Sequence, residues 1–337
     1  MTAINGFINL YKPIDWTSHD CVAKLRGLLR TKKIGHGGTL DPKATGVLPV
    51  AVGKATKLLQ YLPSDKAYRA VVRFGVTTTT DDLEGEVVTQ RPAAQLTLEA
   101  VEAALPQFLG AIAQTPPLYS AIQVDGKRLY NLARQGKSVE VPSRQVAIHQ
   151  LQPQHWQSGK QPELTLDVDC GPGTYIRSLA RDLGEAVGTG ATLAKLIRTH
   201  SSGFDLAQSI SLETLEQALQ AGDFKPVEAN RPLQHMPAIV LPADLALRWR
   251  MGQKLPLSDR MAGPGLDTAI SVSEGSPSAP LRVLEAATQT FLGIGEIKLN
   301  APAAIPAESS EPETGVPLKV LACKRVYLSY NGSQKTV

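Results

Sequence analysis

The sequence predicts a mixed α+β domain followed by a small C-terminal β-barrel. Over about the first 230 residues, some segments have apolar residues at helical spacing and others alternate, without the regular strand–helix repeat of a doubly wound sheet. Beyond about residue 240 the segments become short and strand-like, separated by stretches rich in Pro, Gly, Ser and Ala. The length of 337 residues agrees with two domains, since a typical domain has ~150 residues.

The first elements are a helix, a loop and a second helix. Thr17 and Asp20 have the spacing of a capping box, and apolar residues at helical spacing follow, so a helix is expected over residues 18–30. The next segments are a glycine-rich loop, an apolar run and a helical segment, at residues 35–42, 47–52 and 54–62.

The later elements are strands and one further helix. Alternating residues predict strands at 67–74 and 163–170, and a helix is expected over 176–187 after the sequence GPG. A proline-bearing stretch at 232–241 is interpreted as a linker. The strands expected beyond it are residues 248–257, 281–286, 290–298 and 319–327.

The composition indicates a globular chain without a membrane span or a disulfide framework. Hydrophobic residues make up 42% of the sequence, which is enough apolar material for a core. There is no run of ~18 apolar residues, and the first residues do not have the pattern of a secretory signal. The three cysteines are far apart, which favours a reducing, cytoplasmic compartment.

Charge is distributed unevenly along the chain. Residues 1–75 contain twelve Lys or Arg and four Asp or Glu, a net charge of +8, whereas the whole chain has a formal charge of +4. This asymmetry favours a surface that attracts a polyanion such as a nucleic acid. A basic surface that is merely solvated explains the charge equally well.

The common cofactor motifs are absent from the sequence. In GHGGTL at residues 35–40, a leucine replaces the third glycine of the dinucleotide-binding fingerprint. Between Gly46 and Gly53 there are six residues, whereas a phosphate-binding loop has four between its glycines. The sequence also lacks the His-Glu-x-x-His and Gly-x-Ser-x-Gly motifs. We therefore expect no metal and no cofactor.

The segment GHGGTLDPKATGVLP at residues 35–49 is a tight loop that holds one acid, Asp41. Its glycines permit backbone conformations that other residues avoid, and Pro42 restricts Asp41 to an extended conformation. An ionised carboxylate in such a loop can serve as a nucleophile or a base. The same pattern is also typical of an aspartate that caps a turn.

Several segments together resemble the TruB family of tRNA pseudouridine synthases. The loop resembles the family's aspartate motif, which continues through residues 45–57. Four further segments resemble, in order, its lysine-proline motif, tyrosine motif, RNA-gripping insertion and arginine motif: GFINLYKP at 6–13, KAYRA at 66–70, TPPLYSAIQVDGKR at 115–128 and GTYIRSL at 173–179. The C-terminal stretch resembles a PUA RNA-binding domain more weakly.

The resemblance implies the fold and the domain organisation of this family. A pseudouridine synthase catalytic domain is expected at residues 1–232, with a mixed, largely antiparallel sheet, flanking helices and the insertion at about 112–146. A PUA-like β-barrel is expected at residues 236–330. Two loops within it, at about 263–280 and 301–317, are longer than a compact PUA domain needs.

The implied activity is the isomerisation of uridine 55 in the T loop of tRNA to pseudouridine. The N1–C1′ glycosidic bond breaks, the uracil turns, and C5 joins C1′. By resemblance Asp41 is the catalytic nucleophile or base, Arg177 is the arginine that pairs with it, and Tyr68 stacks on the uracil or relays a proton. From the residues alone, Arg177 is an ordinary arginine at a helix start and Tyr68 a half-buried strand aromatic.

The resemblance also implies which residues hold the RNA. The target base is stacked and must be flipped out, which costs on the order of a few kcal/mol. His36 matches the histidine that the family inserts into the loop, although a histidine in a glycine turn is usually a surface residue. Tyr175 is expected to line the same pocket, and Lys12 to support its floor. The candidate phosphate contacts are Lys32, Lys33, Lys43, Lys127, Arg128 and Arg134.

Two other functions fit the same motifs. One is a synthase of the dyskerin branch that acts on other RNA with a guide RNA, but the insertion and the length favour a stand-alone tRNA enzyme. The other is an RNA chaperone that only refolds tRNA, against which the complete set of Asp41, Tyr68 and Arg177 argues. The expected partner is the T stem-loop of tRNA, with no membrane, no obligate protein partner and a monomeric state.

Overall fold

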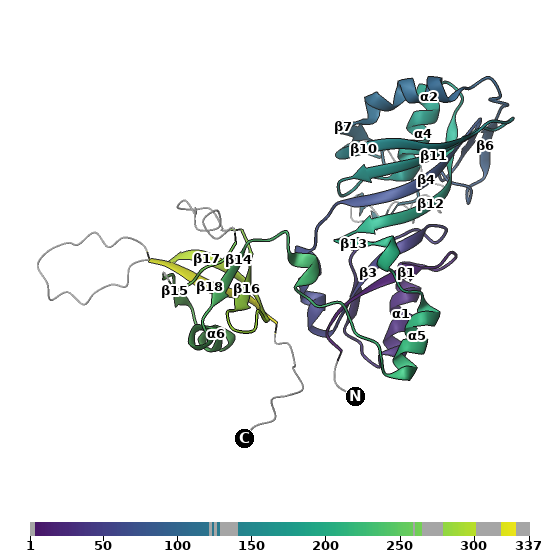
Figure 1. Ribbon diagram of the computed structural model, residues 1–337. Coiled ribbons are helices and arrows are strands. Elements are labelled where there is room, and N and C mark those ends of the chain that lie inside the picture. The colour runs from purple at the N-terminus through teal and green to yellow at the C-terminus, as the bar shows by residue number, and fades with distance from the viewer. Residues whose placement is uncertain are drawn as a thin grey trace, which may run out of the picture.

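The structure is a computed structural model that describes residues 4–120, 123–124, 127–128, 141–258, 260–264, 279–300 and 318–327. Figure 1 shows a large sheet flanked by helices, and a smaller sheet formed by the C-terminal residues. Among the described helices, none combines the length and the apolar character that crossing a membrane requires.

The large sheet follows the order β1-β3-β12-β4-β11-β10-β7, with β2 paired to β3 and β13 paired to β12. Neighbouring strands run antiparallel except β3 and β12, which run parallel. The predicted mixed, largely antiparallel sheet is therefore confirmed. The bounds are β1 (Gly6–Lys12), β2 (Ile34–His36), β3 (Thr45–Val52), β4 (Lys66–Phe74), β7 (Gly110–Gln114), β10 (Arg144–Gln157), β11 (Glu163–Cys170), β12 (Ala191–Ser201) and β13 (Phe204–Asp205).

Four helices of the described part of the chain flank this sheet. Figure 1 shows α1 and α5 beside β1 and β3, and α2 and α4 beside β10 and β11. Their bounds are α1 (Ser18–Leu28), α2 (Leu98–Ala104), α4 (Ile176–Ala186) and α5 (Leu212–Ala221). The predicted capping box opens α1, because the Thr17 hydroxyl accepts the Asp20 amide and the Asp20 carboxylate accepts the Thr17 amide. The helix predicted over residues 54–62 is a 3-10 helix, Gly53–Tyr61.

Smaller elements complete this part of the chain. Two hairpins are β5 (Val76–Thr78) with β6 (Val87–Gln90), and β8 (Gln123–Val124) with β9 (Lys127–Arg128). Further 3-10 helices lie at Leu105–Phe108, Leu206–Gln208 and Arg231–Leu233. Of the insertion predicted at about 112–146, residues 121–140 lie outside the described residues, apart from β8 and β9.

The parallel pairing of β3 with β12 requires a glycine. Gly46 lies opposite Arg198 in the register and has a φ of +103°. A Cβ atom at Gly46 would overlap the carbonyl oxygen of Arg198. Glycine allows both the backbone conformation and the close approach. The pairing places β12 directly beside the segment that follows the Asp41 loop.

The smaller sheet has the order β14-β16-β17-β18-β15. Its elements are β14 (Ala238–Leu241), α6 (Ala243–Arg250), β15 (Leu255–Pro256), β16 (Leu281–Glu285), β17 (Phe291–Asn300) and β18 (Leu318–Val326). The strand predicted over residues 248–257 was wrong, since its first part belongs to α6. Leu245 and Trp249 are buried one helical turn apart in the core of this sheet, which favours the helix.

The interpretation of residues 232–241 as a linker was also wrong. Leu233 and Ala238 are fully buried, and β14 pairs parallel with β16. One hydrophobic cluster contains Phe7 of the large sheet together with Leu284 and Ile294 of the smaller sheet, and thus joins the two parts. The domain bounds 1–232 and 236–330 stay a prediction. The two predicted long loops lie largely outside the described residues.

Candidate active site

The Asp41 loop borders a cavity of about 600 Å³. The cavity is lined by all three residues predicted to be catalytic, Asp41, Tyr68 and Arg177, and by Tyr175. These residues come from a loop, from β4 and from the start of α4, and they are up to 136 positions apart in the sequence. The volume lies within the range of small-molecule sites and can accept a nucleoside.

Arg177 connects the carboxylate of Asp41 to the cavity wall. Its Nη2 lies 3.0 Å from Asp41 Oδ2 and donates to the carbonyl of Tyr119 at 3.1 Å. The side chain of Arg177 is 7% exposed, whereas that of Asp41 is 43% exposed. The arginine is thus fixed inside the wall, and the carboxylate it binds remains open to a ligand.

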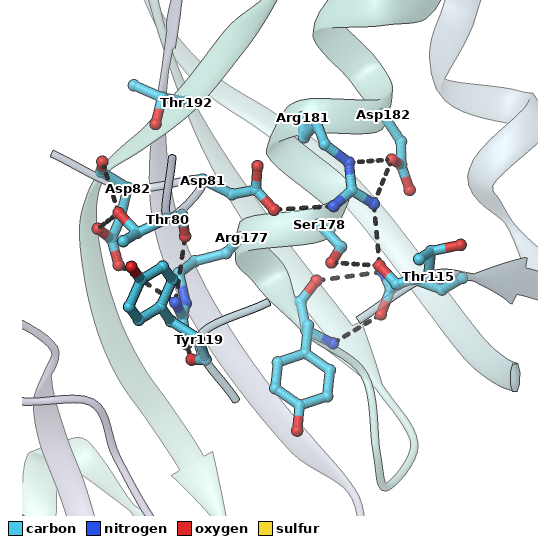
Figure 2. A network of polar contacts seen from close by, with 12 residues as sticks. Thr80, Asp81, Asp82, Thr115, Tyr119, Arg177, Ser178, Arg181, Asp182 and Thr192 are labelled. Atoms are coloured by element: carbon cyan, nitrogen blue, oxygen red, sulfur yellow. Dashed lines mark hydrogen bonds and ion pairs between the residues drawn. The ribbon is translucent and has the colours of Figure 1, made fainter. Parts of the chain in front are cut away.

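The other terminal nitrogen of Arg177 contacts a second acid, Asp82. Figure 2 shows Arg177 between Tyr119 on one side and Thr80 and Asp82 on the other. Its Nη1 donates to the Thr80 carbonyl at 3.1 Å and lies 3.5 Å from Asp82 Oδ2. Asp82 is held in turn by the Thr80 hydroxyl at 2.5 Å. Two carboxylates therefore offset the burial of one arginine.

Sequence reasoning missed Asp82, and it also missed Lys66. The acidic pair at the end of TTTTDD, residues 77–82, is a weak local signal for Asp82, because only the fold brings it to Arg177. Lys66 lines the same cavity, donates to the Ser64 carbonyl at 2.9 Å, and has its pKa lowered by burial. The cavity thus has a second cationic group besides Arg177.

The start of α4 is anchored by side chains of the neighbouring chain segment. Gln114, at the end of β7, accepts the Tyr175 amide at 2.8 Å and donates to the Tyr175 carbonyl at 3.1 Å. Ser178 donates to the Thr115 carbonyl at 2.8 Å (Figure 2). These contacts bracket Arg177, so the direction in which its side chain leaves the helix is fixed.

Tyr68 is almost fully buried in the cavity wall. The residue is 8% exposed, and it lies opposite Arg198 in the β4–β12 register. Burial raises the pKa of Tyr68 to about 12, although the positive charge of nearby Arg198 acts in the other direction. The phenol is therefore protonated at neutral pH and can donate a hydrogen bond to a ligand.

Lys12 lies beneath the loop, not in the cavity. It is fully buried, and its Nζ donates to the carbonyls of Pro13, Trp16 and Pro42 at 2.9, 2.5 and 3.0 Å. Burial lowers the pKa of Lys12, while nearby acids, including Asp41, raise it. An ammonium has three donors, and all three are used. The contact with Pro42 holds the backbone directly after Asp41.

With this geometry in view, the matches to known proteins decide the family. Residues 26–176 match the N-terminal domain of TruB family pseudouridylate synthases. Residues 177–248 match the tRNA pseudouridylate synthase B C-terminal domain, and residues 237–301 match the C-terminal domain of pseudouridine synthase II TruB. The tRNA pseudouridine synthase B of Trichormus variabilis is 54% identical over 295 residues, which is 88% of this chain and 95% of that protein.

The chain belongs to the TruB family of pseudouridine synthases. A second relative, tRNA pseudouridine synthase B of Acaryochloris marina, is 58% identical over 251 residues, 74% of this chain and 86% of that protein. Among solved structures, a Cbf5-Nop10-Gar1 complex contains a chain with a TM-score of 0.63 and 25% identity, covering 86% of this chain and 78% of that one. An H/ACA RNP bound to a substrate RNA has the same fold, with a TM-score of 0.67, 21% identity, and coverage of 97% and 86%.

In this member of the TruB family, the predicted RNA-binding residues are spread over a wider area than the cavity. His36, at the end of β2, does not line the cavity, and its ring packs edge-on against His19 with the centroids 5.4 Å apart. Burial, and then His19, lower the pKa of His36. Lys32 and Lys33 are exposed, and Lys43 is bound to Asp15 at 2.5 Å.

The other three residues predicted to contact RNA belong to the insertion. Arg134 and the side chains of Lys127 and Arg128 lie outside the described residues. Within the described part of the chain, no group of three His, Cys, Asp or Glu side chains is arranged to hold a metal ion.

Proposed function

We propose that this protein is a tRNA pseudouridine synthase that isomerises uridine 55 of the T loop. The observation that carries the proposal is the pairing of Asp41 with buried Arg177 at the edge of a nucleoside-sized cavity, beside Tyr68. Family membership and the names of its close relatives support the same reaction and the same substrate class.

The geometry suits a reaction at the sugar of a flipped uridine. The exposed Asp41 carboxylate lies at the cavity wall, where it can attack the ribose or remove a proton from it, and both routes remain open. The N1–C1′ bond then breaks, the uracil turns, and C5 bonds to C1′. The C5 hydrogen leaves and N1 gains a proton, so the product is an isomer of the substrate. No electron acceptor or group donor is needed.

The side chains around Asp41 divide the remaining work. Arg177 holds the carboxylate in place, because its own position is fixed by Tyr119 and Thr80. Tyr68 can stack on the uracil, and its protonated hydroxyl can donate to the substrate or relay a proton. His36 lies outside the cavity, where it can fill the space that the flipped base leaves in the T loop.

We propose that the enzyme acts alone, as a monomer, without a guide RNA or an obligate protein partner. The basic exposed segment around Lys32 and Lys33 supports direct binding of tRNA phosphates. A tRNA substrate and three free cysteines both favour the cytoplasm.

The deciding experiment is incubation of the protein with unmodified tRNA transcript, followed by mapping of pseudouridine. We expect pseudouridine at position 55, in the absence of any other RNA. Asp41→Asn, near-isosteric but unable to act as nucleophile or base, should bind the transcript and lose ~10⁴-fold or more in rate. Product that forms only with an added guide RNA would favour the dyskerin-type alternative. Refolding of tRNA without any pseudouridine would favour a chaperone.

A further inference from the structure

Arg198 is a fully buried cation that the proposed chemistry has not used. It lies on β12, and its side chain is 0% exposed. Among the described residues, no acid forms an ion pair with it. Burial of a guanidinium is costly unless hydrogen bonds replace the lost water. Here the replacement comes from three backbone carbonyls: Nε donates to Val47 at 2.7 Å, Nη1 to Thr39 at 3.2 Å and Nη2 to Gly38 at 3.1 Å.

Two of these carbonyls belong to the loop that carries Asp41. The next residue, Leu40, is held by buried Ser18 of α1, whose hydroxyl oxygen accepts the Leu40 amide at 2.9 Å. The residue after Asp41, Pro42, is held by Lys12. From residue 38 to residue 42, every residue except Asp41 is therefore bonded through its backbone to a buried side chain, and the carboxylate of Asp41 is bonded to Arg177.

Arg198 also faces the other side of the site. Tyr68, which lines the cavity, lies opposite it across the β4–β12 pair. The two side chains are close enough for the positive charge of Arg198 to act on the pKa of Tyr68, in the direction opposite to the dominant effect of burial. Arg198 therefore lies between the loop that carries Asp41 and the strand that carries Tyr68.

We infer that Arg198, assisted by Ser18, is a positioning residue for pseudouridine formation: its guanidinium fixes the loop that presents Asp41. The inference rests on the proposed function. Lysine cannot replace this arginine, because an ammonium on a flexible stem does not reproduce the planar fork that reaches the carbonyls of Gly38, Thr39 and Val47 together. A displacement of the loop by about 1 Å can cost ~10²-fold in rate.

The test compares Arg198→Lys and Ser18→Ala with a matched control, Arg282→Lys. Arg282 is also a buried arginine, but it lies in the smaller sheet, where Nε donates to the Met236 carbonyl and Nη1 to the Asn230 side chain, both at 3.1 Å. For each variant we would measure the single-turnover rate of pseudouridine formation, the Kd for tRNA and the Tm.

We expect Arg198→Lys to slow the single turnover by roughly 10- to 100-fold and Ser18→Ala by roughly 3- to 10-fold, each with the Kd for tRNA within about twofold of wild type. Arg282→Lys should lower the Tm and leave the single-turnover rate unchanged. A rate for Arg198→Lys within threefold of wild type, or an equal loss in Arg282→Lys, would overturn the inference.

Folding does not obscure the outcome. If Arg198→Lys fails to fold, the test rests on Ser18→Ala. This substitution is small and neutral, and it removes one contact to the loop without leaving a buried charge. A normal rate in Ser18→Ala then refutes the positioning of the loop, and a slower rate at unchanged Tm and Kd supports it. An active wild type with unaffected variants refutes only this inference, whereas a wild type that forms no pseudouridine refutes the proposed function on which it rests.

Discussion

Replacement of Asp82 by asparagine should uncouple Arg177 from its second acid. Asp82 Oδ1 accepts the Thr80 hydroxyl and the Glu84 amide, while Oδ2 faces Arg177 at 3.5 Å. In Asp82→Asn, an amide oxygen that still accepts from Thr80 and Glu84 leaves the NH₂ group facing the guanidinium of Arg177, where a donor meets donors. If the amide is flipped so that its oxygen faces Arg177, the contacts with Thr80 and Glu84 are lost. Arg177 then has a single carboxylate partner, Asp41.

The magnitude follows from the distance and the burial. Two unit charges 3.5 Å apart attract by about 5 kcal/mol at an effective dielectric constant of 20, and exposures of 7% and 15% leave little screening. Neutral asparagine also avoids the cost of burying a carboxylate, so we expect a net loss of ~1–3 kcal/mol. If this loss comes from misdirection of Arg177 and Asp41, the single-turnover rate falls by about tenfold to hundredfold.

The assay is single-turnover pseudouridine formation on tRNA transcript, with Tm measured in parallel. Asp81→Asn is the matched control, because Asp81 is the adjacent acid but pairs with Arg181 at 2.8 Å instead of Arg177 (Figure 2). Asp81→Asn should lower the Tm and keep the rate. Equal rates for wild type and Asp82→Asn, or equal losses in both variants, would refute the reasoning.

Three further predictions concern the substrate. Tyr68→Phe should slow single turnover roughly 10²–10⁴-fold at unchanged Kd. Because burial raises the pKa of Tyr68 to about 12, the stability of the fold that is linked to the protonated phenol should persist below pH ~10 and be lost towards pH ~12. A rate inflection near pH 8 that Tyr68→Phe abolishes would contradict the raised pKa. Charge reversal at Lys32 and Lys33 should weaken tRNA binding and lower the salt dependence by about one unit per lost phosphate contact; an unchanged slope would mean that both are merely solvated. His36→Ala should cost about tenfold to a hundredfold on whole tRNA and less on a loosened T-loop hairpin, whereas equal losses on both would contradict a role in base flipping.

Local sequence patterns were sufficient to predict an element where residues close together in the sequence determine its structure. The capping box of Thr17 and Asp20 predicted the start of α1, because both hydrogen bonds form within one turn. Resemblance to a family brought Asp41 and Arg177 together, which periodicity cannot do over 136 positions. The strand prediction failed over residues 248–257, since the burial of Trp249 against the smaller sheet depends on strands that are distant in the sequence.

Sequence patterns did not reveal Arg198 and Asp82, because the contacts of these residues exist only in the folded chain. Arg198 lies on β12, whose register with β4 shifts between Leu193 and Lys195 and again between Arg198 and His200. These irregularities break the period of two, so the buried face cannot be read from alternation. The carbonyls that Arg198 binds have no side-chain signature at all. Asp82 likewise has no local pattern that points to Arg177.

The parallel pairing of β3 with β12 also determines when the enzyme matures during synthesis. Asp41 leaves the ribosome early, but Arg177 and Arg198, which hold its carboxylate and its loop, are made much later. At ~5–20 residues per second, residues 42–198 take roughly 8 to 30 s to translate. Throughout that interval Lys12 and Ser18 are present to hold the loop, but the carboxylate of Asp41 has no Arg177 and the loop has no Arg198. The complete set of contacts around Asp41 can therefore form only after β12, which lies between β3 and β4, has been made.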